Sequence, residues 1–378
     1  MHRLRELRAD VSGQRDHRGK GLSGMAKELW KGNEAVAEAA IRAGCRYFFG
    51  YPITPQNEIP EYFSRHMPEH GGVFLQAESE VAAINMTYGA AGCGARVMTS
   101  SSSPGISLKQ EGISYLAGAE LPVVIVNMMR GGPGLGSIAP GQSDYFQATR
   151  GGGNGDYRTV VLAPATIQEM TDLTQEAFDI ADLYRIPVLI LADGMIGQMM
   201  EAVEWKKPRA RKLPPKDWAT TGTKDKREHN IINSLFIDPK DCTEHNIRLQ
   251  QKHDKITANE IRFEEYLTDD AEVLFVSYGT TARICQSAAL KLREEGIKAG
   301  VFRPISLWPY PEKELFACAN RGSVKTVVCA EMSMGQMIDD VKIALGGSKP
   351  VRFFGTGGGT FPTPAELMSA ARAALEEV

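Results

Sequence analysis

The feature that most constrains the fold of this chain is the alternation of short apolar runs with longer helical patterns between residues 25 and 204. The apolar runs are typical of strands that are buried on both faces of a parallel sheet. They lie at 47–50, 73–76, 95–98, 123–127, 159–162 and 188–191. Helical patterns separate them at 33–44, 79–91, 106–118 and 166–184. This order predicts a doubly wound α/β domain, whose ligand crevice lies outside the carboxyl ends of the strands.

The composition changes after residue 204. A basic, proline-rich segment at 205–216 predicts the exit from the first domain, and residues 205–269 are expected to form a connector with an amphipathic helix at 243–266. Residues 270–378 are expected to form a second, smaller α/β domain. Its strands are predicted at 272–278, 299–303, 326–330 and 351–354, and its helices at 281–295 and 336–345.

Charge, hydropathy and cysteine spacing exclude several classes of protein. The 378 residues carry a formal net charge of −3, which gives no reason to expect a nucleic-acid partner. No apolar run approaches the roughly 20 residues needed to cross a bilayer. Six scattered cysteines without a CxxC pair predict neither a metal nor an iron–sulfur site in this chain, and they favour a reducing, cytoplasmic compartment. The arginine-rich residues 1–24 lack the apolar core of a secretory signal, so we expect a disordered tail or an extension.

The 38 glycines concentrate in loops that follow predicted strands, above all at 131–136 and 355–359. Glycine at such places lets the backbone turn tightly or approach a ligand closely. The loops contain neither GxGxxG nor the GK[ST] of a phosphate-binding loop, so a nicotinamide or ATP site is poorly supported. Tight turns alone explain about half of these glycines.

Two hydroxyl-bearing turns follow predicted strands. In the first, YPITP at 51–55, Thr54 before Pro55 has the pattern of a helix N-cap with proline at the first helical position. This would place the Thr54 hydroxyl and a positive helix end at the ligand edge of the sheet. The second turn, SSSPG at 101–105, contains Ser103 and Gly105 and is a candidate anion site at a helix start.

Charged side chains lie at two further strand ends. Glu78 and Glu80 precede an apolar helix, where an acid is either a helix-dipole partner or a carboxylate that bonds a ligand nitrogen. Arg130 ends a strongly apolar strand, where it is either exposed or a recognition group for a carboxylate.

Taken together, these motifs resemble the α subunit of the 2-oxoacid:ferredoxin oxidoreductases. The likeness runs from about residue 25 to the end and rests on YPITP, the QAESE of 76–80, the SSSPG of 101–105, the RGGPGLG of 130–136 and the FRPISLWP of 302–309. The segments DYFQAT at 144–149, GDYR at 155–158 and EMSMGQ at 331–336 are most similar to the 2-oxoisovalerate (3-methyl-2-oxobutanoate) type. The 2-oxoglutarate type is the alternative.

The resemblance implies a pyrimidine-type thiamine diphosphate-binding domain at 25–204 and a transketolase C-terminal-like domain at 270–378. It implies that Glu80 activates the cofactor, that Arg130 pairs with the substrate carboxylate and that Thr54 bonds substrate near the reacting carbon. Cofactor contacts are also expected from the neighbouring turn residues, which are Tyr51, Pro52, Ser103 and Gly105. Glu78 is the rival to Glu80.

The resemblance further implies that the cofactor is shared with a β subunit, which supplies the Mg²⁺ and an iron–sulfur cluster. Gamma and ferredoxin-like subunits, ferredoxin and the co-substrate coenzyme A complete the expected system, which decarboxylates a 2-oxo acid oxidatively to acyl-CoA and CO₂. A transketolase-type enzyme is set aside because 155–157 lacks the diphosphate-binding pattern. A non-catalytic assembly subunit with the same fold remains a further alternative.

Overall fold

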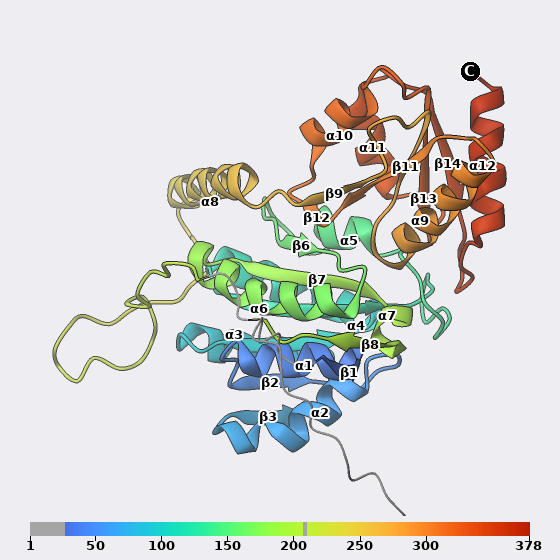
Figure 1. Cartoon of the computed structure of the whole chain (residues 1–378). Coiled ribbons are helices and arrows are strands. Elements are labelled where there is room, and N and C mark those ends of the chain that lie inside the picture. Colours follow the sequence, from blue (N-terminus) through green and yellow to red (C-terminus); the bar gives the residue numbers. More distant parts are fainter. Residues whose placement is uncertain (1–26, 207–209) are drawn as a thin grey trace, which may run out of the picture.

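The computed structural model describes residues 27–206 and 210–378 and contains two α/β domains (Figure 1). The predicted tail at 1–24 lies outside the described residues. The larger sheet has seven strands in the order β12-β6-β7-β5-β4-β2-β3. Its strands are β2 (Tyr47–Gly50), β3 (Val73–Gln76), β4 (Val97–Ser101), β5 (Val123–Met129), β6 (Val160–Leu162), β7 (Pro187–Asp193) and β12 (Ser306–Trp308). The six predicted strands of the first domain are all present.

Helices cover both faces of the larger sheet, as the predicted doubly wound arrangement requires (Figure 1). Successive residues of β5 enter opposite cores: Val124 and Val126 pack in one cluster, and Val123 and Ile125 pack in the other. The helices of this domain are α1 (Gly32–Arg42), α2 (Glu58–His66), α3 (Glu80–Gly92), α4 (Ser103–Gly118), α5 (Tyr145–Thr149), α6 (Ile167–Tyr184) and α7 (Gly194–Gln198), with a 3₁₀ turn at Pro68–His70. The strands β1 (Glu28–Lys31) and β8 (Met200–Val203) form a separate two-stranded sheet.

The second domain is built on a five-stranded sheet in the order β14-β13-β10-β11-β9. Its strands are β9 (Phe263–Tyr266), β10 (Val273–Val276), β11 (Ala299–Pro304), β13 (Thr326–Glu331) and β14 (Val351–Gly355). Its helices are α9 (Gly279–Glu294), α10 (Glu312–Ala319), α11 (Met337–Leu345) and α12 (Pro364–Glu376). Leu274 and Val276 of β10 belong to the same buried cluster as Ile125 of β5, so one core runs through both domains.

The connector differs from its prediction at both ends. The expected helix at 243–266 is shorter and begins earlier, as α8 (Pro239–Asn259). Residues 263–266 instead form β9, which pairs antiparallel with β11. The reason lies in the sequence FEEY at 263–266, in which Phe263 and Tyr266 flank two acids. One of these acids, Glu264, forms an ion pair with Arg303 of the neighbouring strand β11 at 2.7 Å.

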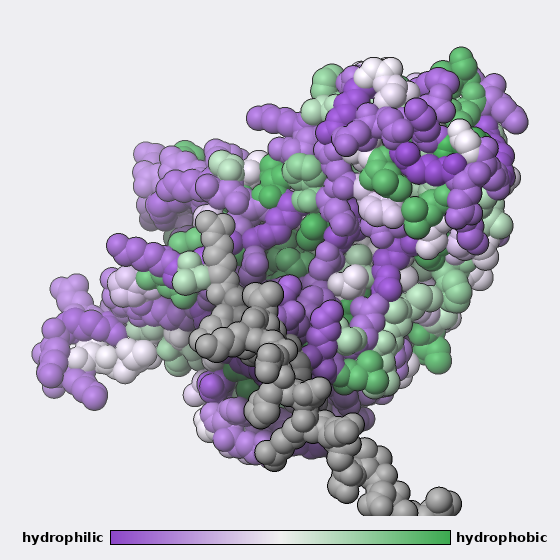
Figure 2. All heavy atoms as spheres, viewed as in Figure 1, coloured by the Kyte–Doolittle hydropathy of each residue, from purple (hydrophilic) through white to green (hydrophobic). Residues whose placement is uncertain are grey.

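The short strand β12 was not predicted, and it joins the larger sheet rather than the smaller one, pairing antiparallel with β6. The second half of the chain thus completes the sheet of the first. Exposed hydrophobic and hydrophilic residues are interspersed over both domains on the face seen in Figure 2. Within the described residues, no helix is long and apolar enough to cross a membrane.

Candidate active site

The candidate site lies at the carboxyl edge of the larger sheet. The parallel strands β5, β4, β2 and β3 are neighbours in that order, so the segments that follow them meet at one edge. These segments are 130–141 after β5, 102–105 after β4, 51–57 after β2 and 77–80 after β3. The topology therefore brings together the turns that the sequence singled out in the first domain.

Glu80 is the first residue of α3, and it is 6% exposed. The preceding Ser79 caps the helix, because its hydroxyl accepts a hydrogen bond from the Ala82 amide at 3.1 Å. Across the described residues, the Glu80 carboxylate has no hydrogen-bond or ion-pair partner. Its oxygens are not among the fully buried polar atoms without partners, so the carboxylate stays open to a donor from outside the chain.

Gly105 makes room for the Glu80 carboxylate. A Cβ atom built at Gly105 would lie 2.7 Å from Glu80 Oε1 and 2.1 Å from Ser101 Oγ. The Ser101 hydroxyl is buried and has no hydrogen-bond partner among the described residues. Any larger residue at 105 would displace both groups, so glycine is required there by close approach.

The rival acid, Glu78, is exposed, whereas Glu80 is buried. A helix-dipole role alone would not need a buried carboxylate, because charges near a helix end are favourable at the surface as well. The burial of Glu80 against Gly105 supports the choice of Glu80 over Glu78 as the residue that faces a ligand.

Arg130 is 7% exposed, so it is not the surface arginine that the sequence left open. Its Nη1 donates to the Thr54 carbonyl at 3.0 Å and its Nη2 donates to the Leu135 carbonyl at 3.0 Å. Its Nε is buried without a partner among the described residues. The guanidinium thus ties the loop after β2 to the glycine loop after β5 and keeps one donor unused.

Thr54 is not a helix N-cap, and that prediction was wrong. Helix α2 begins at Glu58 and its N-cap is Asn57. The chain first makes a turn in which the Gln56 amide donates to the Ile53 carbonyl at 3.0 Å, and this delays the helix by three residues. Thr54 is exposed instead, beside Arg130.

Tyr51 and Pro52 are exposed at the same edge. Tyr51 is held through the buried side chain of Gln56, whose Nε2 donates to the Tyr51 carbonyl at 3.4 Å and whose Oε1 accepts from Ser100 Oγ at 2.5 Å. This loop is therefore anchored to the end of β4 while its outward side chains stay accessible.

Ser103 is engaged within the chain. Its Oγ donates to Asp144 Oδ2 at 2.6 Å, and its Oγ accepts from the Arg130 amide at 3.0 Å. Asn127 completes this group, because its Nδ2 donates to Asp144 Oδ2 at 2.9 Å and its Oδ1 accepts from the Ser103 amide at 3.1 Å. Burial raises the pKa of Asp144. Ser103 is thus part of the scaffold that fixes the start of α4 and the end of β5.

The two glycine loops meet between the domains. A Cβ atom at Gly131 would lie 2.9 Å from the Gly358 carbonyl carbon, and one at Gly359 would lie 2.5 Å from Ala139 Cβ. Beside this contact is a cleft of about 430 Å³. It is lined by residues of both domains, among them Ser103, Gly132, Asp144, Met334, Gln336 and Gly357. Glu80 is outside that lining.

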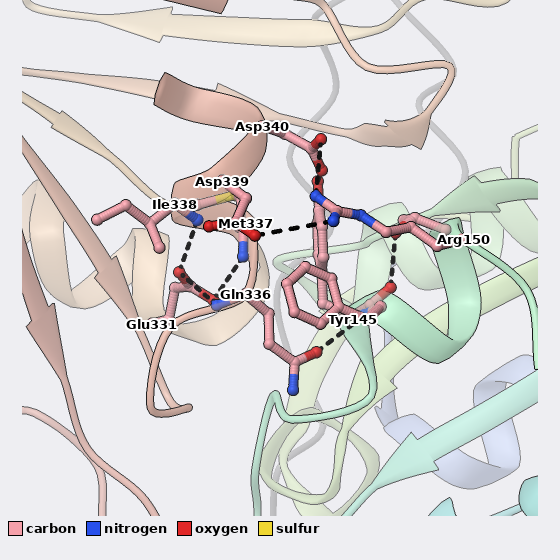
Figure 3. A network of polar contacts seen from close by, with 10 residues as sticks. Tyr145, Arg150, Glu331, Gln336, Met337, Ile338, Asp339 and Asp340 are labelled. Atoms are coloured by element: carbon pink, nitrogen blue, oxygen red, sulfur yellow. Dashed lines mark hydrogen bonds and ion pairs between the residues drawn. The ribbon is translucent and has the colours of Figure 1, made fainter. Parts of the chain in front are cut away.

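A network of polar contacts fixes the second domain beside this cleft (Figure 3). The Glu331 carboxylate, at the end of β13, accepts from the Met337 and Ile338 amides at 2.9 and 3.0 Å, at the start of α11. From α11, Asp340 accepts from Tyr145 Oη of α5 at 2.5 Å. These contacts hold the loop after β13 against the first domain.

Two site-edge residues were missed by the sequence reasoning. Asp144 was named only as part of a similar segment, although its half-buried carboxylate accepts from both Ser103 and Asn127 and so fixes the loop. Lys109 gave no signal at all, because a single lysine in a helix is typical of a solvated face. In the structure it is fully buried. Within the described residues, no group of three or more His, Cys, Asp or Glu side chains could hold a metal ion.

Comparison with known proteins identifies the family. The thiamine-diphosphate-binding domain of pyruvate flavodoxin/ferredoxin oxidoreductases matches residues 38–266, which is more than half of the chain, and core domain II of pyruvate:ferredoxin oxidoreductase matches residues 271–367. The chain belongs to the 2-oxoacid:ferredoxin oxidoreductases. The predicted family, fold class and enzyme class are thereby confirmed.

Several relatives are similar over most of their length. The ketoisovalerate oxidoreductase subunit VorB of Methanothermobacter thermautotrophicus is 51% identical over 85% of this chain and 91% of its own. The 2-oxoglutarate synthase subunit KorA of Archaeoglobus fulgidus is 40% identical over 88% of this chain and 96% of its own.

A solved structure of the same family has a similar fold. It is the 2-oxoglutarate:ferredoxin oxidoreductase of Magnetococcus marinus with 2-oxoglutarate, coenzyme A and succinyl-CoA bound, which has a TM-score of 0.83 and 25% identity. The match covers 93% of this chain and 65% of that one. The fold of this chain is therefore shared with an oxidoreductase whose structure contains a bound 2-oxo acid and bound coenzyme A.

Proposed function

We propose that this chain is the α-type subunit of an oxidoreductase that converts a branched-chain 2-oxo acid to acyl-CoA and CO₂ and passes the electrons to ferredoxin. The observation that carries the proposal is the buried Glu80 carboxylate, which has no partner in the described residues and lies against Gly105 at the edge of the sheet. A carboxyl group so placed fits a ring nitrogen of thiamine diphosphate, because one proton held between the two would make the hydrogen bond that the side chain lacks.

The residues of this chain then have distinct roles. When bound, thiamine diphosphate supplies the nucleophilic carbon and accepts the electrons of decarboxylation. Glu80 holds a proton at the pyrimidine ring, and the space over Gly105 admits that ring. Arg130, with an unused Nε, faces the substrate carboxylate, and the exposed Thr54 hydroxyl bonds substrate near its reacting carbon. Tyr51, Pro52 and Ser103 border the cofactor.

The substrate that we propose follows from the sequence identity to relatives that are named for their substrates. The relative named for ketoisovalerate is 51% identical, whereas the Archaeoglobus relative named for 2-oxoglutarate is 40% identical. A 2-oxoglutarate-specific enzyme is the second candidate, and the structural similarity to the Magnetococcus enzyme favours it. Coenzyme A is the proposed acyl acceptor in either case.

A partner subunit is proposed to complete the site. Val81 follows Glu80 on α3, and Leu108 and Tyr115 lie on the neighbouring α4; all three side chains are exposed. A β subunit that covers this surface would exclude water from the Glu80 carboxylate. We assign the Mg²⁺ and the iron–sulfur cluster to that β subunit, and we expect gamma and ferredoxin-like subunits besides.

A cytoplasmic location, without nucleic-acid or membrane partners, agrees with six free cysteines and a net charge of −3. We keep 25–204, 205–269 and 270–378 as the proposed division of the chain.

The test is reconstitution with the β subunit. Bound thiamine diphosphate and coenzyme A-dependent viologen reduction would be measured with 2-oxoisovalerate, 2-oxoglutarate and pyruvate. We expect the highest kcat/KM for 2-oxoisovalerate, loss of activity in Glu80→Gln and near-normal activity in the exposed control Glu78→Gln. An assembled complex without cofactor would favour a non-catalytic assembly subunit, and loss of activity in Glu78→Gln alone would reverse the assignment.

A further inference from the structure

Helices α3 and α4 meet along a seam of close contacts. Gly105, Lys109 and Gly112 lie on one face of α4, at positions i, i+4 and i+7. A Cβ at Gly105 would lie 2.7 Å from Glu80 Oε1, and a Cβ at Gly112 would lie 2.6 Å from Ile84 Cγ1. Glu80 and Ile84 are one turn apart on α3. Lys109 thus lies between the two contacts, on the face of α4 that meets Glu80.

The Lys109 side chain is 0% exposed. Its Nζ donates to Thr99 Oγ1 at 2.6 Å and to the Ser100 carbonyl at 3.0 Å, both in β4. These bonds use two of the three protons of an ammonium group. A buried lysine is rarely found without an opposite charge, and an apolar residue would fill the seam at lower cost.

Glu80 supplies that opposite charge. It is the ionisable group whose charge acts on Lys109, and it favours the charged form of the lysine. Tyr88 is a further titratable residue on α3, and Asp193 ends β7 on the sheet below. Neither contributes to the charge balance at Lys109, which is set by burial and by Glu80. The Glu80 charge therefore acts on Lys109 across the seam, although no ion pair joins the two side chains among the described residues.

We propose that Lys109 is a positioning residue that acts on the Glu80 carboxylate from the α4 side of the seam, without touching the cofactor. The link between the two side chains rests on the close contacts of the seam, and the effect of the Glu80 charge on Lys109 supports it. Its role in cofactor binding rests on the proposed function.

The first test uses the full chain without cofactor. Burial lowers the pKa of Lys109 to about 7, while the Glu80 charge opposes this shift. The lysine signals of isotope-labelled protein would be followed by NMR as a function of pH, with Lys109 assigned by its absence in Lys109→Gln. In Glu80→Gln we expect the Lys109 midpoint to move to lower pH by about one unit, which is a tenfold change in proton affinity. In the exposed control Glu78→Gln it should not move. An unchanged midpoint in Glu80→Gln overturns the proposal.

The second test uses the complex assembled with the β subunit. Affinity for thiamine diphosphate would be measured in Lys109→Gln, Glu80→Gln and the double variant. We expect Lys109→Gln to weaken binding about tenfold, and we expect the double variant to bind no more weakly than Glu80→Gln, because the lysine acts through the acid. Fully additive losses would assign Lys109 a merely structural role and overturn the proposal.

The two tests separate this proposal from the proposed function. If the wild-type complex binds no cofactor, the proposed function fails and the positioning role in cofactor binding falls with it. The NMR result still decides whether Glu80 and Lys109 are coupled across the seam.

Discussion

Gln142 of the first domain and Met332 of the second exchange two hydrogen bonds. The Gln142 amide donates to the Met332 carbonyl at 2.8 Å, and the Met332 amide donates to Gln142 Oε1 at 3.0 Å. The same side chain bonds the start of α9, because its Nε2 donates to the carbonyl of the N-cap residue Tyr278 at 3.0 Å and its Oε1 accepts from Thr281 Oγ1 in the first turn at 2.8 Å. One buried glutamine therefore fixes the interface from which the candidate cleft is built.

This relationship predicts a large effect of Gln142→Leu. The change leaves the Met332 amide and the Thr281 hydroxyl buried without partners, and each such loss costs about 1–3 kcal/mol. We expect the free energy of unfolding to fall by at least about 2 kcal/mol in chemical denaturation. The exposed control Gln250→Leu should change it by less than about 0.5 kcal/mol. Equal effects of the two variants would contradict the role of Gln142.

Gly105→Ala should separate cofactor binding from stability. The added Cβ would lie 2.1 Å from Ser101 Oγ and 2.7 Å from Glu80 Oε1, so the carboxylate must move away from its position. We expect a loss of stability of about 1–3 kcal/mol from overpacking, together with a loss of thiamine diphosphate binding in the reconstituted complex. Calorimetry of binding and thermal unfolding would measure the two effects.

The control for this substitution is Gly89→Ala, on the exposed side of α3. No atom lies within 4 Å of its added Cβ, so alanine should stabilise the helix by about 0.5–1 kcal/mol and leave binding unchanged. If Gly105→Ala bound the cofactor as tightly as Gly89→Ala does, Glu80 would not need its present position.

The main strands could be predicted because a strand buried on both faces is apolar throughout, as in 123–127 and 188–191. The short β12 and β9 could not, because their residues are placed by pairing with β6 and β11 rather than by a pattern of their own. The helix start near Thr54 failed for a similar reason: a local turn at Gln56 competes with the capping pattern.

The candidate site divides in the same way. Glu80 and Arg130 were singled out as charges that follow apolar strands, and their proposed roles came from the family resemblance. Lys109 was not, because its burial depends on Gly105 and Gly112 allowing α3 and α4 to approach closely, which is a property of two helices together. Gln142 lies in an irregular loop, where no periodicity indicates burial.

Arg130→Lys should impair substrate binding more than folding. Lysine keeps the charge, but its single ammonium cannot reproduce the fork that reaches both the Thr54 and Leu135 carbonyls. We expect the KM for the 2-oxo acid to rise about tenfold or more with a smaller change in kcat, measured by steady-state viologen reduction. Arg42→Lys, at an exposed position on α1, serves as the control and should leave both constants unchanged. A fall in kcat at constant KM would place Arg130 in the chemical step instead.

The stability of the chain should rise with pH in a window set by Lys109. Its pKa falls from the usual 10.5 to about 7 in the folded chain, because burial disfavours the ammonium form. Between these values the unfolded chain binds more protons than the folded chain, so the free energy of unfolding increases with pH, by up to about 1.4 kcal/mol per pH unit. Below about pH 7 both states bind the proton and the contribution is constant. The free energy of unfolding in urea would be measured from about pH 6 to about pH 10 for the wild type and for Lys109→Met. The difference between the two proteins removes the contributions of other titratable groups. The two curves of unfolding free energy against pH should differ in slope above about pH 7. Parallel curves for the two proteins would show that Lys109 keeps an ordinary pKa in the folded state.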